Sequence, residues 1–113
     1  MKKIEAIVRH AKLNQITDAL LTNGIKGMNM TDIKGFGRQL GHNDLHGKQE
    51  VRAPIYLPMV KLEIVLDAQL VDKAIAIIQK NAFTGQVGDG KIFVSAVENV
   101  VRIRTNQSGK EAI

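Results

Sequence analysis

The stretch from Thr84 to Val94 reads Thr-Gly-Gln-Val-Gly-Asp-Gly-Lys-Ile-Phe-Val. It decides whether the chain has the fold of a P-loop protein, in which a helix follows the glycines, or a fold in which a strand follows them. From Gly85 to Lys91 its spacing is that of a P-loop, in which glycines turn backbone N–H groups inward around phosphate oxygens. A P-loop also needs a serine or threonine hydroxyl at the next position and a helix after it. Here Ile92 takes that position, and the following residues read as a strand. The stretch is therefore either a phosphate cradle of another design or a plain glycine-rich turn.

The residues around this stretch predict a strand, a helix and a second strand. Alternation from Met59 to Leu66 places three apolar side chains on one face, namely Leu62, Ile64 and Leu66. Asp67 is a candidate N-cap for the helix that follows. The apolar stripe of that helix consists of Val71, Ala74, Ile75, Ile78 and Ala82. Ile92 to Val97 completes the unit as a strand.

The first part of the chain repeats this order. Residues 2–9 alternate, with Ile4, Ala6 and Val8 on one face, which predicts a strand buried on one side. Asn14 is a plausible N-cap for a helix that ends at Gly24, with the apolar positions Ile16, Leu20 and Leu21. A second strand is expected over about 28–36.

Two strand-helix-strand units without a composition break predict one domain over residues 1–113. The expected fold is α+β and ferredoxin-like, an antiparallel sheet with both helices on one face. Val100, Val101 and Ile103 predict a short fifth strand. Because Ile7 and Val65 place apolar side chains on the opposite face, we expect another subunit to cover it.

The segment from Gly37 to Leu57 separates the two units and has little periodicity. Loops of this length in a compact domain are usually functional or disordered. We predict a mobile arm that folds against a ligand or a partner. The arm contains His42 and His46 near carboxylates, but loop histidines without a rigid scaffold are more often solvated polar residues. We therefore predict no metal site made by the protein alone.

Two further groups of residues suit an anionic ligand. The stretch from Gly35 to Gly41 allows close approach to the backbone, with Arg38 as a fork for phosphate and Gln39 as a neutral contact to a metal ion or a carboxylate. Arg102 and Arg104 lie two positions apart, so on a strand both point to one face. Two guanidinium groups side by side repel each other unless an anion lies between them. The alternatives are a glycine-rich hinge and ordinary exposed arginines.

Composition narrows the classes of function. Sixteen Lys and Arg against 11 Asp and Glu give a net charge of +5, which permits a nucleotide, a nucleic acid or a membrane surface as partner. The absence of cysteine excludes disulfides and thiol catalysis and fits a cytoplasmic protein. No apolar run is long enough to cross a membrane. Ser95 and Ser108 have no obvious histidine or lysine partner, so we predict no dedicated catalytic machinery.

Taken together, these motifs resemble the PII family of signal-transduction proteins, which are trimeric sensors of nitrogen and energy status. The resemblance spans nearly the whole chain. It is most specific at Lys34 to His42, which reads Lys-Gly-Phe-Gly-Arg-Gln-Leu-Gly-His, and at Thr84 to Val94. It implies a homotrimer of ferredoxin-like subunits with ATP or ADP in each cleft between neighbours. The arm, at about 37–57, becomes the T-loop, which changes conformation with the ligand and docks on target proteins.

The resemblance also implies roles for single residues. The residues that cradle the phosphates are Gly88, Asp89, Gly90 and Lys91. The arginines that clasp them are Arg38, Arg102 and Arg104. The surroundings of adenine and ribose are Ile7, Gly35 and Val65. Gly37 and Gln39 belong to the same ligand-binding stretch, and Gln39 is the usual contact for Mg²⁺ and 2-oxoglutarate.

This chain departs from the family pattern at three places. Met59 replaces the lysine that pairs with a carboxylate of 2-oxoglutarate, and loss of one such contact costs about 1.5–3 kcal/mol, roughly ten- to a hundredfold in affinity. The modifiable tyrosine position aligns near Val51 and leaves Tyr56 as the only tyrosine, so we do not expect nucleotidylation. Asn29 replaces a common threonine near the base and retains hydrogen-bonding ability.

We therefore expect a regulatory sensor, not an enzyme, that reports ATP against ADP and has a weak or lost response to 2-oxoglutarate. Slow ATP hydrolysis stays open. The expected target is a membrane transporter or its regulator, for ammonium or polyamine uptake. Lys48 and Arg52 of the arm would contact this target. The protein itself would be cytoplasmic, and a transporter would recruit it to the membrane without insertion.

Three alternatives to this interpretation stay open, and the last two belong to other classes of function. The first is a conventional nitrogen sensor of ATP and 2-oxoglutarate that controls an ammonium transporter. The second is an RNA-binding ferredoxin-like module, although three Phe and one Tyr form no strand cluster on which bases could stack. The third is a small nucleotidase. We expect no nucleic-acid partner.

Overall fold

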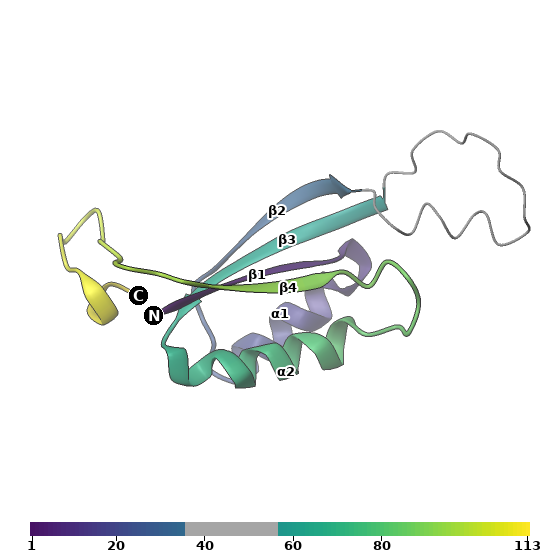
Figure 1. Ribbon diagram of the computed structural model, residues 1–113, viewed down its shortest axis with the longest axis horizontal. Coiled ribbons are helices and arrows are strands. Elements are labelled where there is room, and N and C mark those ends of the chain that lie inside the picture. The colour runs from purple at the N-terminus through teal and green to yellow at the C-terminus, as the bar shows by residue number, and fades with distance from the viewer. Residues whose placement is uncertain (36–56) are drawn as a thin grey trace, which may run out of the picture.

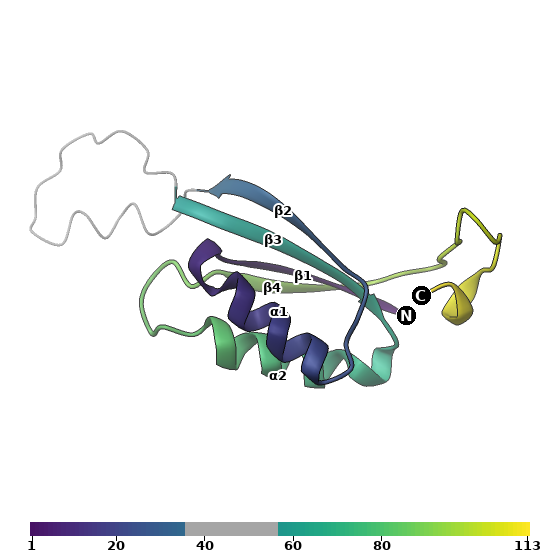
Figure 2. The same cartoon turned by 180° about the vertical axis from the view of Figure 1, so that it is seen from behind.

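Four antiparallel strands form a single sheet in the computed structural model, which describes residues 1–35 and 57–113. The strands are β1 (Lys2–Arg9), β2 (Met28–Gly35), β3 (Leu57–Leu66) and β4 (Lys91–Ala96), in the spatial order β2-β3-β1-β4. Helices α1 (Leu13–Thr22) and α2 (Val71–Ala82) both pack on one face (Figures 1 and 2). The predicted α+β, ferredoxin-like arrangement of two strand-helix-strand units is confirmed.

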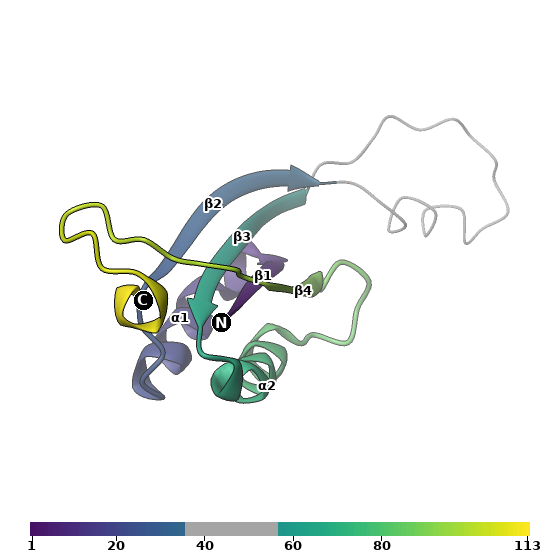
Figure 3. The same ribbon diagram turned by 60° about the vertical axis from the view of Figure 1, so that its left-hand side comes forward.

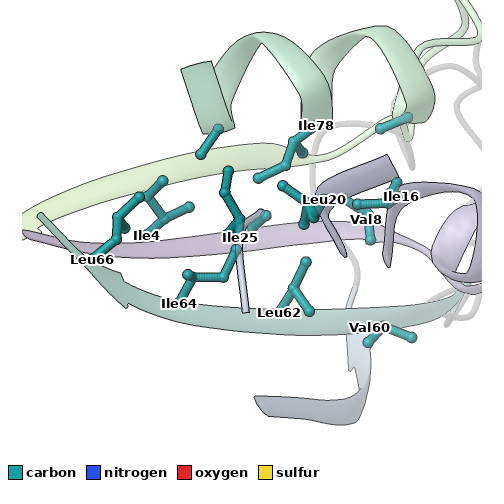
Figure 4. Packing of buried hydrophobic residues seen from close by; sticks show 13 residues of the cluster. Ile4, Val8, Ile16, Leu20, Ile25, Val60, Leu62, Ile64, Leu66 and Ile78 are labelled. Atoms are coloured by element: carbon teal, nitrogen blue, oxygen red, sulfur yellow. The ribbon is translucent and has the colours of Figure 1, made fainter. Parts of the chain in front are cut away.

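The core lies between the sheet and the two helices, as the alternation and the helical stripes predict, except that Leu21 of the predicted stripe of α1 is exposed. Side chains from β1, β3 and both helices interdigitate there (Figure 4). In the register, Ile4 of β1 lies opposite Ile64 of β3 and Val94 of β4, so the central strand is bonded on both sides. Each large aliphatic side chain buried in this way contributes about 1.5–3 kcal/mol relative to exposure.

The beginning of α1 differs from the prediction, whereas its end follows a known motif. A short 3-10 turn (His10–Lys12) precedes the helix, so Lys12 holds the cap position and Asn14 lies inside the first turn. At the other end, Gly24 has a φ of +81° and donates to the Leu21 carbonyl at 3.0 Å. Ile25 donates to the Leu20 carbonyl, also at 3.0 Å. This pair of bonds is a Schellman motif, in which glycine accepts the left-handed conformation without strain.

The second helical segment begins as predicted at Asp67, but through an intervening turn. The Asp67 carboxylate accepts a hydrogen bond of 3.1 Å from the Gln69 N–H and so caps a 3-10 turn (Ala68–Leu70) that leads into α2. Lys110 of the C-terminal 3-10 turn (Gly109–Ala112) also lies 3.0 Å from this carboxylate. The predicted stripe of α2 is confirmed, with Ala74, Ile78 and Ala82 buried.

The predicted fifth strand is wrong. Among the described residues, Val101 forms only an isolated bridge with Ser108, and Ile103 is fully exposed. The Arg102 N–H donates to the Gln107 carbonyl, and Asn106, with a φ of +59°, donates back to the Arg102 carbonyl, each at 2.8 Å. These bonds close a turn. The three apolar residues Val100, Val101 and Ile103 pair with no strand of the described sheet, so no fifth strand forms there.

The sheet face opposite the helices carries charged side chains beside apolar ones. Lys3 Nζ lies 2.8 Å from Glu63 and 3.4 Å from Glu5. The hydrogen bond from Lys3 is the main cause that holds the pKa of Glu63 below its ordinary value. On the same face, Ile7 and Val65 are half-buried within one chain. That a second subunit covers them stays a prediction.

Neither helix of the described residues is long and apolar enough to span a membrane. In the same parts of the chain, 1–35 and 57–113, no group of three or more His, Asp and Glu side chains gathers in a geometry for a metal ion.

Candidate functional site

The glycine-rich stretch Thr84–Lys91, here called the glycine loop, joins α2 to β4. Gly85, Gly88 and Gly90 have φ values of +84°, +102° and +98°, a region that favours glycine. At Gly90 a Cβ atom would lie 1.7 Å from the carbonyl oxygen of Ile7. The loop backbone therefore lies directly against β1, and the glycine there is a steric requirement.

Asp89 turns its carboxylate into the glycine loop. Its Oδ2 accepts hydrogen bonds from the N–H groups of Thr84 at 2.8 Å and Gly85 at 3.0 Å, and its Oδ1 accepts from the Thr84 hydroxyl. These bonds, led by the one from the hydroxyl, hold the pKa of Asp89 well below its ordinary range. Because the folded-state pKa is lowered, the stability that the ionised form contributes is present at neutral pH and is lost only in strong acid.

Arg9 is a residue of this region that the sequence did not indicate. It ends β1, and its Nε donates to Asp89 Oδ1 at 3.2 Å while its Nη2 donates to the Val87 carbonyl at 2.9 Å. The sequence likewise indicated no role for the Thr84 side chain, which was named only as the first residue of the stretch Thr84–Val94. The spacing of 80 residues between Arg9 and Asp89 leaves no local pattern from which this contact could be found.

Four consecutive backbone donors of the glycine loop are left for a ligand. Within the described residues, the N–H groups from Val87 to Gly90 have no hydrogen-bond acceptor, whereas those of Thr84, Gly85 and Gln86 are bonded inside the loop. Successive free N–H groups at glycines with positive φ form an anion-binding concavity. Lys91 follows them and adds a positive charge.

A cleft of about 360 Å³ adjoins the glycine loop. Its lining brings together four of the predicted site residues, which are Ile7, Asp89, Gly90 and Lys91. The apolar part of the lining comes mainly from α2 and β4 and includes Ile75, Ile78 and Ile92. The structure thus assembles one part of the predicted site within a single chain.

Val65 lies elsewhere, in a larger cavity of about 910 Å³ near the other end of the sheet. Asn29 and Glu63 line the same cavity from β2 and β3, and the lysines that line it are Lys3, Lys26 and Lys110. Its lining combines apolar side chains with cations and hydrogen-bonding groups. This composition suits an anionic ligand with a flat apolar part.

The predicted arginine pair also lies far from the glycine loop. The loop precedes β4 and the arginines follow it, so they lie beyond opposite ends of that strand (Figure 3). Arg102 donates to Gln107 Oε1 at 3.2 Å and to the Ile113 carbonyl at 3.4 Å, and Arg104 is exposed. Both lie in or beside a turn, so the expectation of a shared strand face was wrong.

The remaining predicted positions belong to the arm. Gly35 ends β2, where it pairs with Leu57, so β3 begins at the last residue assigned to the arm. The other predicted residues lie outside the described ones, namely Gly37, Arg38, Gln39, Lys48 and Arg52.

The fold and this loop define a class of protein, a ferredoxin-like domain with a glycine-rich loop before β4. The family described as "Nitrogen regulatory protein P-II" matches residues 1–107. Two curated relatives of that name are 52% identical (Azospirillum brasilense) and 50% identical (Mesorhizobium japonicum), and each alignment covers all of both chains. The chain therefore belongs to the nitrogen regulatory protein P-II family.

A solved structure supports the same assignment. The crystal structure of PII from Arabidopsis thaliana bound to citrate is similar with a TM-score of 0.81 at 38% identity, over 99% of this chain and 91% of that one. Members of the family are regulatory signal proteins, typically trimeric, that bind small effectors such as ATP, ADP and 2-oxoglutarate and act on target proteins.

Proposed function

We propose that this protein senses the cellular energy state by binding ATP and ADP competitively in clefts between three copies of the chain. The observation that carries this proposal is the separation of the predicted site into two parts. The glycine loop and Ile7 lie at one end of the sheet, and Val65 and the arginine pair lie at the other. Neither part alone has both a phosphate cradle and a full set of opposing cations, so a neighbouring copy completes the site.

In this proposal the glycine loop binds the phosphates of the nucleotide. Its free N–H groups from Val87 to Gly90 face negative charge, and Lys91 adds an ammonium group. Asp89 contributes its backbone N–H, since its carboxylate is occupied inside the loop. Arg102 and Arg104 of the neighbour close the site from the other side, and Arg38 of the arm adds a further phosphate contact.

The base and ribose occupy the cavity that contains Val65. Asn29 and Glu63 offer amide and carboxylate groups for hydrogen bonds, and Val65 offers an apolar surface for the ring. Ile7 and Gly35 of the neighbouring copy, the copy that provides the glycine loop, complete the surroundings of the base and ribose. Gly37 and Gln39 of the arm are further proposed ligand contacts, and Gln39 would contact Mg²⁺ that accompanies ATP.

The nucleotide would control a target protein through the arm. ATP and ADP can shift the arm only to the extent that they differ in affinity for its conformations. We propose a membrane transporter or its regulator, for ammonium or polyamine uptake, as the target and Lys48 and Arg52 as contacts. The protein would act from the cytoplasm, and slow ATP hydrolysis would be incidental to this role.

Titration calorimetry tests the central claim. ATP and ADP should each bind with micromolar-range affinity and compete for the same sites, because they share the adenosine and the first two phosphates. Light scattering on the same samples should give the mass of a trimer. Absence of binding by both nucleotides, or a monomer that binds with full affinity, would rule out the proposed site.

The response to 2-oxoglutarate tests the second part of the proposal. Met59 is buried and lies in register opposite Arg9 of β1 and Ile33 of β2, where a thioether offers no charge to a dicarboxylate. The wild type should therefore show less than about a twofold change in ATP affinity on addition of 2-oxoglutarate, while Met59→Lys should gain roughly tenfold coupling.

The conventional nitrogen sensor is the alternative, favoured by relatives of about 50% identity that carry the name Nitrogen regulatory protein P-II. Strong coupling between ATP and 2-oxoglutarate in the unmodified protein would establish this alternative and would contradict our interpretation of Met59.

A further inference from the structure

We propose that Thr84, Asp89 and Arg9 form a brace that holds the glycine loop in its phosphate-accepting shape, and that Thr84 and Arg9 are positioning residues that do not touch the nucleotide. This inference rests on the proposed function and deepens it. It assigns a task to two residues that have none in the nucleotide site described above.

The brace centres on the Asp89 carboxylate, which accepts four hydrogen bonds. Three come from the beginning of the loop, from the N–H and hydroxyl of Thr84 and the N–H of Gly85, and one comes from Arg9 on β1. The carboxylate therefore ties the two ends of the loop to each other and to the sheet. A carboxylate turned toward phosphates would repel them, so this inward position also removes a negative charge from the ligand side.

The Thr84 hydroxyl serves the brace in two directions. It donates to Asp89 Oδ1 and accepts from the Gln86 N–H at 3.2 Å. The first three N–H groups of the loop are thus bonded internally, and those from Val87 to Gly90 have no acceptor among residues 1–35 and 57–113. The internal bonds decide which donors face the ligand.

The Arg9 side chain, which comes from the end of β1, contacts the later half of the loop. Its guanidinium group donates both to Asp89 and to the Val87 carbonyl, and a Cβ atom at Gly88 would lie 3.0 Å from Arg9 Nη2. The cation is thus packed against the loop backbone and neutralises Asp89. It acts on the phosphates through the position of the N–H groups that they would contact.

Substitutions at Thr84 test the brace. Thr84→Val keeps the shape but removes the hydroxyl, and we expect about a tenfold loss of affinity for both ATP and ADP in calorimetry, with or without Mg²⁺. Thr84→Ser should restore most of that loss. Thr17→Val is the matched control, because the Thr17 hydroxyl donates to the Asn14 carbonyl within α1 and has no part in the glycine loop. An unchanged affinity in Thr84→Val would overturn the proposal, as would a loss confined to ATP with Mg²⁺.

Arg9→Met distinguishes a brace from a direct phosphate contact. A direct contact would lower the salt dependence of ATP binding, whereas a brace leaves the salt dependence equal to that of Lys80→Met, an exposed charge-matched control. Because Arg9 and Thr84 act through the same carboxylate, the loss in the double variant Arg9→Met/Thr84→Val should be smaller than the product of the single losses. Independent losses or a reduced salt dependence would contradict the brace.

Hydrogen exchange tests the brace without any nucleotide. In the free protein, the N–H groups of Gly85 and Gln86 should exchange at least about tenfold faster in Thr84→Val than in the wild type, because their acceptors are displaced. Unchanged exchange would overturn the brace even if ATP binds. Failure of the wild type to bind ATP, with exchange altered as expected, would instead overturn the proposed function and leave the brace standing.

Discussion

Gly90→Ala is expected to lower the affinity for ATP and ADP by at least about a hundredfold. The new methyl group would lie 1.7 Å from the carbonyl oxygen of Ile7 and 2.8 Å from its carbonyl carbon, so the glycine loop must move away from β1. The φ of +98° adds backbone strain of about 1–2 kcal/mol for a residue with a side chain. Both effects displace the free N–H groups of the loop from the phosphates.

Calorimetry on the purified variant measures this loss, and Gly109→Ala provides the matched control. Gly109 also has a positive φ, of +72°, but a Cβ atom there would meet nothing within 4 Å. The control therefore carries the strain without the clash and should bind ATP within about threefold of the wild type. If Gly90→Ala fails to fold, circular dichroism will show it, and Gly88→Ala then tests the loop, since its clash is with the flexible Arg9 side chain. Nucleotide binding by Gly90→Ala at wild-type strength would contradict the phosphate role of the loop.

Lys91→Ala and Arg102→Ala are each expected to weaken ATP binding by about a hundredfold, but a mixture of the two should regain binding. Each substitution removes one charge-assisted contact to phosphate. If Lys91 of one copy and Arg102 of its neighbour share a ligand, each mixed trimer contains a cleft in which both are intact. In the isolated mixed trimers about one cleft in three is of this kind, which corresponds to about one in four over all trimers after random assembly from equal amounts.

Co-expression with two different affinity tags isolates the mixed assemblies, and calorimetry then gives the fraction of sites with wild-type affinity. Trimers made only of one variant, passed through the same two steps, serve as the control. A mixed assembly without any high-affinity site would show that both residues act within one chain. Thermal unfolding of each variant separates lost binding from lost stability, because both side chains lie outside the core.

The sheet and the helices could be predicted because their periods recur over many residues. In β1 and β3, apolar residues recur at every second position, and in α2 they recur at helical spacing. Several residues in each element therefore indicate the same buried face, and the structure buries that face. The start of α1 could not be predicted, since Lys12 caps it without a side-chain bond. The run from Val100 to Ile103 is too short to specify a partner strand, and a turn closes there instead.

The site was predictable where one short motif contains all of its parts. The glycine loop is such a motif, and its turn and its steric limits follow from the glycines. The role of the Asp89 carboxylate was not predictable, because its partner Arg9 lies 80 positions away and they meet only in the folded sheet. The separation of Val65 from the glycine loop likewise depends on the register in which β1 pairs with β3, which no local pattern contains.

The strand order β2-β3-β1-β4 also has a consequence for biosynthesis. The first strand-helix-strand unit contains no strand pair of its own, since β1 and β2 are separated by β3. In a nascent chain, β1 therefore has no strand to pair with until the ribosome has made β3. It gains its second partner strand only when β4 has been made. Folding should be all-or-none and late, so that a prematurely terminated product is degraded and does not enter an oligomer beside full-length copies.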